Sequence, residues 1–232
     1  MIYNIPQLAG VALTQNLFAE MRKNPNVIGV KNSSMPVQDI QMFKQAAGPD
    51  YIIFNGPDEQ FMSGRVIGAE GAIGGTYGAM PELYLKLDEY VKAGEMEKAR
   101  EIQYVCDAII YKMCSAHGNM YAVIKAILKI NEGLELGGVR EPLPALVEAD
   151  MDIVKEAAQM IYDTCKKNGW RIDILLNNAG FGGQGDFTRE RSMEQDLSMI
   201  AVNIETPTRI LKLFLPDMIK RGSGKVLNVS ST

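Results

Sequence analysis

Short runs of apolar residues recur at regular intervals along the first third of the chain. They lie at Ile2–Tyr3, Val27–Val30, Tyr51–Phe54 and Gly71–Ile73. Helical or polar segments separate them, and this alternation is typical of repeated βα units. Because the runs are continuous rather than alternating, they indicate parallel strands that are buried on both faces. The pattern therefore predicts an α/β fold with a mostly parallel sheet.

Helical periodicity replaces the strand pattern from Pro81 onward. Proline is suited to the first turn of a helix, and Gly94 is placed to end that helix. Amphipathic stripes predict two further helices, and a long helix is expected from about Leu146 to Lys167. The stripes consist of Ile102, Val105, Ile109 and Met113, and of Val123, Ile127 and Ile130.

Strand-like runs return near the end of the chain, at Ile172–Leu176 and Val226–Val229. A helix of about 25 residues is expected between them, with kinks at Pro207 and Pro216. No linker rich in Gly, Ser or Pro separates these strands from the rest of the chain. We therefore expect one continuous α/β unit.

Composition and charge narrow the classes of partner. The 232 residues, of which 47% are hydrophobic and 22% charged, suit a packed globule of one large or two small domains. The net charge is −4 and no basic stripe is present, so binding to nucleic acid or to anionic lipid has no support. A small molecule is the expected partner.

The cysteines and the single histidine exclude two further classes of protein. Cys106, Cys114 and Cys165 are an odd, widely spaced set, and His117 is the only histidine, so neither a disulfide framework nor a metal site is expected. The start of the chain lacks a secretory signal pattern, and no run of about 18 apolar residues is present. These features predict a cytoplasmic protein without a membrane segment.

Four polar motifs follow the four predicted N-terminal strands in chain order. They are Tyr3-Asn4-Ile5-Pro6, Gly29-Val30-Lys31-Asn32-Ser33, Asn55-Gly56-Pro57-Asp58-Glu59 and Gly71-Ala72-Ile73-Gly74-Gly75-Thr76-Tyr77. Together they resemble the N-acetylneuraminate lyase branch of the dihydrodipicolinate synthase family. The resemblance continues through Gly137-Gly138-Val139-Arg140-Glu141-Pro142-Leu143 to about Met160. Four motifs in one order are far more specific than any one of them.

The residues agree with the Schiff-base chemistry that this resemblance implies. A lysine at the end of an apolar strand is partly desolvated, which favours the neutral amine that attacks a keto carbon, so Lys31 is the candidate nucleophile. The resemblance assigns to Tyr3 the transfer of a proton during carbon–carbon cleavage. It also implies that the substrate, a 2-keto acid, is bound by Ser33, Gly56, Asp58, Glu59 and Gly74.

Each of these residues also has an ordinary structural explanation. A single lysine after an apolar run is usually a strand-end charge, Asp58 and Glu59 could be a solvated pair, and 71–78 could be only a tight turn. Gly75 also stands where neuraminate lyases usually carry a serine, which removes one hydroxyl from the site. The ordered motifs nevertheless favour the lyase interpretation.

The number of predicted barrel strands affects the activity to be expected. A complete (βα)8 barrel takes about 250 residues, whereas the lyase-like segment supplies four predicted strands. The loop that binds the substrate carboxylate in this family has no counterpart. We therefore expect turnover to be impaired, because transition-state stabilisation is lost.

A second set of motifs lies beyond Ile161. It consists of Asp173-Ile174-Leu175-Leu176-Asn177-Asn178-Ala179-Gly180, Val202-Asn203, and Gly224-Lys225-Val226-Leu227-Asn228-Val229-Ser230-Ser231. These motifs resemble the central segment of the short-chain dehydrogenases/reductases. The resemblance implies that Asn177–Gly180 line the cofactor side of a sheet, that Asn203 supports the catalytic water, and that Ser231 polarises the substrate.

Two features of that family have no counterpart. One is the glycine-rich dinucleotide turn of its first βα unit, and the other is the Tyr-x-x-x-Lys motif. Gly180, Gly182 and Gly185 form a G-x-G-x-x-G pattern, but no acidic residue ends a strand about 20 residues later. We therefore expect no cofactor.

The two resemblances meet inside the long predicted helix, which predicts domains of residues 1–160 and 161–232. The first is a half-barrel lyase-like segment with C-terminal helices, and the second is a Rossmann-like segment. One apolar face continues across the junction, which favours recombination of two α/β folds over a misassembled reading frame. That face consists of Ile153, Ala157, Met160 and Ile161.

The expected fold is a partial (βα) barrel fused to Rossmann-like βα elements, in a six-stranded, mostly parallel sheet. Two poorly coupled lobes are the alternative. The predicted function is that of a class I aldolase-type lyase cleaving N-acetylneuraminate, or a similar 2-keto sugar acid, to pyruvate and an aldehyde. The alternatives are a non-catalytic chimeric scaffold and a short-chain dehydrogenase-type NAD(P) oxidoreductase. Unpaired sheet edges also predict a homo-oligomer.

Overall fold

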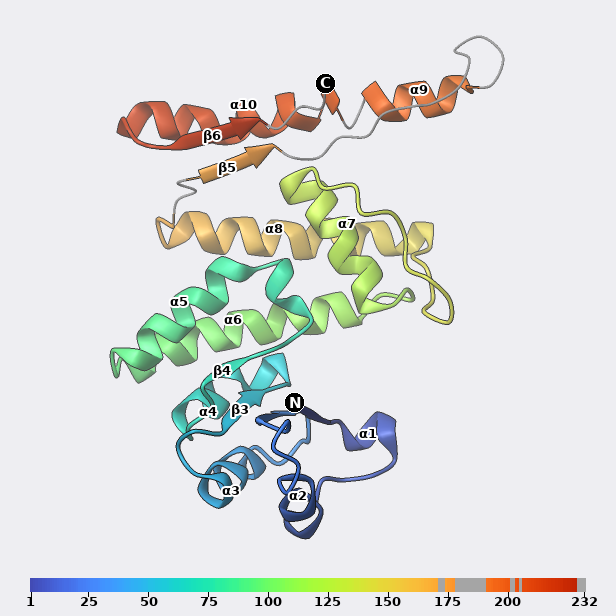
Figure 1. Cartoon of the computed structure of the whole chain (residues 1–232). Coiled ribbons are helices and arrows are strands. Elements are labelled where there is room, and N and C mark those ends of the chain that lie inside the picture. The colour runs from blue at the N-terminus through green and yellow to red at the C-terminus, as the bar shows by residue number, and fades with distance from the viewer. Residues whose placement is uncertain (171–173, 178–190, 201–202, 205, 229–232) are drawn as a thin grey trace. The chain divides into compact units, whose positions relative to one another are not determined.

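The computed structural model describes residues 1–170, 174–177, 191–200, 203–204 and 206–228. The elements group into two compact units, Met1–Lys112 and Met113–Thr232. The strands β1–β4 belong to the first unit, and β5 and β6 belong to the second. Figure 1 labels β3, β4, β5 and β6. Each unit thus has a parallel sheet of its own.

Four parallel strands form the sheet of the first unit. They are β1 (Ile2–Asn4), β2 (Gly29–Asn32), β3 (Ile52–Asn55) and β4 (Gly71–Ala72), paired in chain order. Neighbouring parallel strands need a crossover connection, and helices supply it here. The crossovers contain α1 (Pro6–Ala9), α2 (Gln15–Met21), α3 (Gln38–Ala47), a 3-10 turn η1 (Asp58–Gln60) and α4 (Phe61–Val66). The four predicted N-terminal strands are thus confirmed.

One face of this sheet carries the hydrophobic core. Ile2, Val30 and Ile53 are partners across β1, β2 and β3, and their side chains share one face. They pack against Phe18 of α2 and Phe43 of α3, whose rings meet edge to face with centroids 5.0 Å apart. The amphipathic helices therefore cover this face.

The opposite face carries a second row of partners. Tyr3, Lys31 and Phe54 are aligned across β1, β2 and β3, one residue along from the core row. Because side chains alternate along a strand, this row lies on the face away from the core cluster. Tyr3 is 53% exposed and Lys31 is half-buried. Both candidate catalytic residues therefore lie on the more open face.

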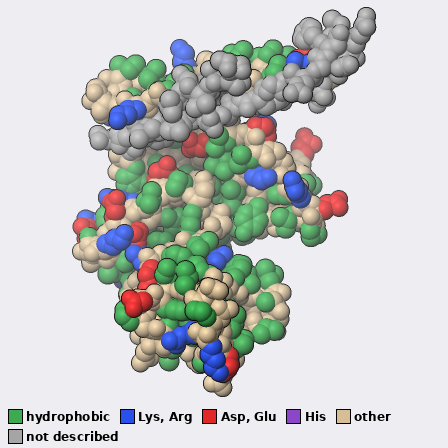
Figure 2. Space-filling view, in the orientation of Figure 1, with side chains coloured by type: hydrophobic (Ala, Val, Ile, Leu, Met, Phe, Trp, Pro, Cys, Tyr) green, Lys and Arg blue, Asp and Glu red, His purple; other side chains and the backbone are tan. Residues whose placement is uncertain are grey.

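In the part of the chain that the structure describes, the first unit has unpaired strand edges and exposed hydrophobic side chains. Within the described residues, β1 and β4 each have a partner strand on one side only. Leu8, Val11 and Met35 are exposed hydrophobic side chains. Figure 2 shows hydrophobic side chains at the surface in the lower part of the view, over the elements α1–α4 of Figure 1. The oligomeric state stays a prediction.

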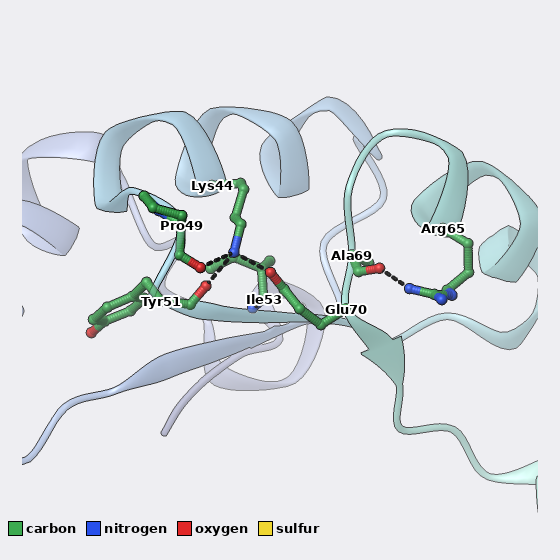
Figure 3. Close-up of polar contacts among 7 residues, drawn as sticks. All are labelled: Lys44, Pro49, Tyr51, Ile53, Arg65, Ala69 and Glu70. Carbon is green, nitrogen blue, oxygen red and sulfur yellow. Dashed lines mark hydrogen bonds and ion pairs between the residues drawn. The ribbon is translucent and has the colours of Figure 1, made fainter. Parts of the chain in front are cut away.

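An ion pair connects α3 to the start of β4 (Figure 3). Lys44 Nζ donates hydrogen bonds to the carbonyl oxygens of Pro49 and Tyr51 at 2.9 and 2.8 Å and pairs with the Glu70 carboxylate. Glu70 also accepts a hydrogen bond from the Ile53 N–H at 2.7 Å. Partial burial acts to raise the pKa of Glu70, but the hydrogen bonds from Lys44 and Ile53 outweigh it and hold the pKa below its ordinary value.

Helices follow the sheet, as predicted. They are η2 (Thr76–Gly78), α5 (Pro81–Lys92) and α6 (Met96–Cys114). Pro81 begins α5, and Gly94 follows its end with a φ of 76°, a conformation that glycine adopts readily. Arg65 of α4 donates to the Ala69 carbonyl (Figure 3) and to Asp88 of α5, the latter at 2.6 Å from Nε to Oδ1. The contact between Arg65 and Asp88 joins α4 to α5.

The second unit begins with packed helices and ends with a strand pair. Its elements are α7 (Met120–Glu132), η3 (Glu148–Asp150), α8 (Met151–Lys167), β5 (Ile174–Asn177), α9 (Met193–Ile200), α10 (Thr206–Arg221) and β6 (Lys225–Asn228). Val123 and Ile127 of α7 and Val154 and Ala157 of α8 are buried. β5 and β6 pair in parallel.

The expectation of one six-stranded sheet is wrong. In the described parts of the chain, β5 pairs with β6 and neither pairs with β1–β4. The physical reason is that the crossover through α9 and α10 returns the chain beside β5, so the two strands satisfy one another locally. The α/β class and the parallel strands are confirmed.

Two predicted helices differ in their bounds from the described elements. The single helix of about 25 residues is described as α9 and α10, with residues 203–204 between them in a π-helical conformation and residues 201, 202 and 205 outside the described part of the chain. Pro207 lies in the first turn of α10, where proline is tolerated. The long helix begins at Met151 rather than Leu146, because η3 occupies residues 148–150. Residues 160 and 161 lie inside α8, and a junction at that point stays a prediction. No described helix is long and apolar enough to cross a membrane.

Candidate functional site

The loops after the four parallel strands begin side by side. The Ser33 N–H donates to the Asn4 carbonyl at 2.7 Å, and the Gly56 N–H donates to the Asn32 carbonyl at 2.8 Å. The Ile73 N–H donates to the Asn55 carbonyl at 2.9 Å in the same way. The carboxyl ends of β1–β4 therefore carry their polar motifs to one edge of the sheet, which is where ligands bind in α/β folds.

Lys31 and Tyr3 lie together on the open face. They are direct partners in the β1–β2 register, and Lys31 Nζ lies 4.0 Å from the centroid of the Tyr3 ring. A cation–π contact of the protonated side chain at an exposed site contributes about 1 kcal/mol or less, so it orients the lysine side chain without locking it. An amine and a phenol are thus within reach of one small molecule.

Three asparagines behind this pair fix the strand ends. Asn4, Asn32 and Asn55 are cross-strand partners and are buried. Asn4 Nδ2 donates to Asn32 Oδ1 at 2.7 Å, and Asn32 Nδ2 donates to Ser34 Oγ at 2.9 Å. The Leu13 N–H donates to Asn4 Oδ1 at 3.1 Å. Sequence reasoning missed this row, although each asparagine lies two residues after a core residue and so falls on the buried face.

Ser33 and Gly56 come into close contact. A Cβ added to Gly56 would overlap Ser33 Oγ and would lie 2.6 Å from the Asn32 carbonyl oxygen. Only glycine allows this approach between the two loops. Ser33 is half-buried and Gly56 is buried. The structure therefore brings these two predicted residues together.

Asp58 and Gly74 form a second contact. The Asp58 carboxylate is 8% exposed and accepts hydrogen bonds from the Thr76 N–H at 2.7 Å and the Thr76 hydroxyl at 2.6 Å. A Cβ on Gly74 would overlap this carboxylate. Burial raises the pKa of Asp58, and the hydrogen bonds from Thr76 offset only part of that rise. Glu59, in contrast, is exposed.

The hydrogen bonds continue from Thr76 into the helices of the first unit. Thr76 Oγ1 lies 3.2 Å from the Tyr84 hydroxyl oxygen. Because Thr76 donates its one hydroxyl proton to Asp58, Tyr84 is the donor in this contact. Burial raises the pKa of Tyr84, and it raises the pKa of the neighbouring Cys106 thiol to about 12. These groups stay neutral at physiological pH.

Gln103 of α6 completes this buried network. Its Nε2 donates to the Asp58 carbonyl at 3.2 Å and to Asp107 Oδ1 at 2.8 Å, and its Oε1 accepts from the Met62 N–H at 2.9 Å. Sequence reasoning missed Gln103 and Thr76. The available signal was a glutamine flanked on α6 by the buried Ile102 and Cys106.

Most residues predicted from the dehydrogenase resemblance lie outside the part of the chain that the structure describes. Asn178–Gly180, Gly182, Gly185 and Ser231 lie outside the described residues. Asn177 is the last residue of β5, and Asn203 is exposed. In the described ranges, no group of three His, Cys, Asp or Glu side chains could hold a metal ion.

Two family models match the chain, and each contains one of the two sets of motifs. Residues 1–161 match the model of the dihydrodipicolinate synthetase family, and residues 135–232 match the model of short chain dehydrogenases. The two matches overlap at 135–161, a range that contains the first part of α8.

Individual relatives resemble the first part of the chain. An N-acetylneuraminate lyase from Mediterraneibacter gnavus is 88% identical over 166 residues, which are 72% of this chain and 53% of that protein. A catalytic lysine mutant of the Ruminococcus gnavus sialic acid aldolase is 87% identical with a TM-score of 0.71, over 72% of this chain and 54% of that one. The Fusobacterium nucleatum N-acetylneuraminate lyase complexed with pyruvate is 31% identical with a TM-score of 0.63, over 69% and 53%. The chain thus spans about half the length of these relatives.

Proposed function

Because residues 1–161 match its family model, this chain belongs to the dihydrodipicolinate synthetase family, and we propose that it acts as a class I aldolase-type lyase. The proposed substrate is N-acetylneuraminate or a similar 2-keto sugar acid, and the products are pyruvate and an aldehyde. The lyase from Mediterraneibacter gnavus, 88% identical over the shared residues, supports this substrate class.

The observation that carries the proposal is the pairing of Lys31 with Tyr3. Their alignment in the β1–β2 register and the 4.0 Å between Lys31 Nζ and the Tyr3 ring put an amine next to a phenol on the open face. The deprotonated amine attacks the keto carbon, and loss of water gives the imine. Tyr3 then accepts the proton of the hydroxyl group two carbons from the imine carbon, as the bond between that hydroxyl-bearing carbon and the carbon next to the imine breaks and releases the aldehyde. Protonation and hydrolysis of the remaining enamine release pyruvate and restore the free amine.

The strand-end loops supply the proposed substrate contacts. The residues proposed to bind the 2-keto sugar acid are Ser33, Gly56, Asp58, Glu59 and Gly74. Support comes from the close contact of Ser33 with Gly56 and of Asp58 with Gly74 at the carboxyl edge of the sheet. The exposed Glu59 carboxylate suits hydroxyl groups of a sugar chain, since a carboxylate accepts hydrogen bonds.

Borohydride trapping tests the proposal. The 232-residue chain is incubated with pyruvate and sodium borohydride, and the intact mass and peptide map are recorded. Reduction of a Lys31 imine adds the mass of pyruvic acid less one oxygen atom. We expect Lys31→Ala to lose the label and Tyr3→Phe to keep it while cleavage falls.

Lys23→Ala is the matched control, because Lys23 is an exposed lysine that pairs with Glu20. This control is expected to label like the unchanged chain. Labelling at another lysine, or equal labelling of Lys31→Ala, would show that Lys31 is not the nucleophile.

The oxidoreductase alternative rests on the match of residues 135–232 to the short chain dehydrogenase model. No described side-chain geometry adds to it, because Asn178–Gly180 and Ser231 lie outside the described residues. The expectation that the lyase needs no cofactor stays a prediction.

A further inference from the structure

We infer that Gln103 is a positioning residue that decides how the sugar end of the substrate is bound, without taking part in imine formation. This inference rests on the proposed lyase function and names a specificity element of its site. Gln103 comes from α6, far along the chain from the strand-end motifs. Its hydrogen bonds among the described residues join Met62, Asp58 and Asp107, and neither Lys31 nor Tyr3 is among these partners.

Both the nitrogen and the oxygen of the Gln103 side-chain amide form hydrogen bonds. Gln103 is 7% exposed, and its Nε2 divides its hydrogen bonds between the Asp58 carbonyl and Asp107 Oδ1. Its Oε1 accepts from the Met62 N–H in the first turn of α4, a group that has no partner within the helix. One side chain therefore holds both η1, where Asp58 and Glu59 lie, and the start of α4.

Asp58 links η1 to the segment that follows β4. Its carboxylate holds the Thr76 N–H and hydroxyl, and Gly74 lies directly against it. The loops after β3 and β4 are therefore fixed relative to each other through a chain of hydrogen bonds that begins on α6. These loops contain Gly56, Asp58, Glu59 and Gly74, four of the five residues proposed to bind the 2-keto sugar acid. They include Glu59, the carboxylate proposed for the hydroxyl groups of the sugar chain.

The two candidate catalytic residues lie outside this network. The bonds that carry the constraint join α6, η1, α4 and η2, whereas Lys31 and Tyr3 are on β2 and β1. Loss of the Gln103 amide should therefore weaken binding of a long 2-keto sugar acid and leave attack on the short pyruvate molecule intact. This difference separates positioning from a general loss of structure.

Two variants of the full chain test the inference. Gln103→Met keeps the length of the side chain and removes its amide. Gln103→Glu keeps an acceptor for the Met62 N–H but places a carboxylate against the Asp58 carbonyl and Asp107. Borohydride trapping is measured against the concentration of pyruvate and, separately, of N-acetylneuraminate. Gln159→Met on α8 is the control, since Gln159 is exposed and donates only to Asp163 among the described contacts.

We expect both Gln103 variants to raise the half-saturating concentration of N-acetylneuraminate by about tenfold, the size of effect expected from one buried hydrogen bond. The value for pyruvate should change by less than about twofold in the same variants. An unchanged value for N-acetylneuraminate, or an equal rise for both molecules, would overturn the inference.

A second measurement distinguishes failure of the inference from failure of the proposed function. If the unchanged chain shows no trapped imine, the proposed function is wrong. Amide hydrogen exchange of the peptide spanning 71–80 then tests the positioning directly, because exchange at Thr76 depends on its bond to Asp58. Faster exchange in Gln103→Met supports the role of Gln103 in holding this loop, and unchanged exchange contradicts it.

Discussion

Asp58 in the first unit and Asp150 in the second are both buried carboxylates that hold loops in place, yet their pKa values move in opposite directions. Burial is the largest influence at Asp58 and raises its pKa, with the Thr76 bonds as a partial offset and the neighbouring Glu59 adding to the rise. At Asp150 the largest influence is the Val147 N–H, which lowers the pKa.

The difference comes from the donors around each carboxylate. Asp150 accepts hydrogen bonds from the N–H groups of His117 at 2.8 Å, Gly118 at 3.0 Å and Val147 at 3.0 Å, and its Oδ1 lies 2.9 Å from His117 Nδ1. Several donors that favour the charged form outweigh the cost of burial. Asp58 has fewer compensating donors and a like charge nearby. A carboxylate whose charged form is disfavoured by its surroundings is typical of functional sites. Asp150, whose charged form is stabilised, acts as a structural anchor.

The largest loss of stability should come from a substitution that displaces the Asp58 carboxylate sterically. Gly74→Ala places a Cβ where the Asp58 carboxylate lies, so the Thr76 bonds must open. We expect a loss of about 3 kcal/mol in the free energy of unfolding, measured by denaturant titration. Gly78→Ala is the control, because a Cβ there meets no atom within 4 Å. Equal stability of the two variants would contradict the packing described for Gly74.

An intermediate effect is expected at Asp150. Its native pKa is lowered, so its stabilising contribution is fully present above the unfolded pKa of about 4 and is lost as the pH falls below that value. Asp150→Asn should lower the midpoint of thermal unfolding by several degrees at pH 7, and the difference should shrink toward pH 3. Asp152→Asn, at an exposed position of α8, is the control. A difference that does not change with pH would show that the charge of Asp150 is not responsible.

The smallest effect on stability is expected at Asp58. Its native pKa is raised, so its contribution is fully present below the unfolded pKa and is lost as the pH rises through the native value. Asp58→Asn should therefore change the free energy of unfolding by no more than about 1 kcal/mol at pH 7. The unchanged chain should gain stability relative to this variant as the pH falls, which is the opposite of the trend at Asp150. Asp152→Asn is again the control, because Asp152 is exposed and lies on α8. A parallel trend in the Asp58 and Asp150 variants would refute the comparison.

The sequence predicted the elements whose signals are local. Continuous apolar runs marked β1–β4, and Pro81 and Gly94 marked the limits of α5. The order of the four motifs also placed Lys31 and Tyr3 at neighbouring strand ends, because parallel strands connected in order bring their carboxyl ends together. Strand and helix periods depend on neighbouring residues, so a single sequence carries this information.

Tertiary structure decided what depends on residues far apart in the chain. The pairing of β5 with β6 rather than with β1–β4 is one example, because an apolar run in the sequence does not determine which strand it will pair with. The bond from Gln103 to Asp58 is another, since it crosses from α6 to η1. The opposite pKa shifts of Asp58 and Asp150 follow for the same reason. Residue type sets the charge of a carboxylate, but burial and hydrogen-bond donors from distant segments set the free energy of that charge.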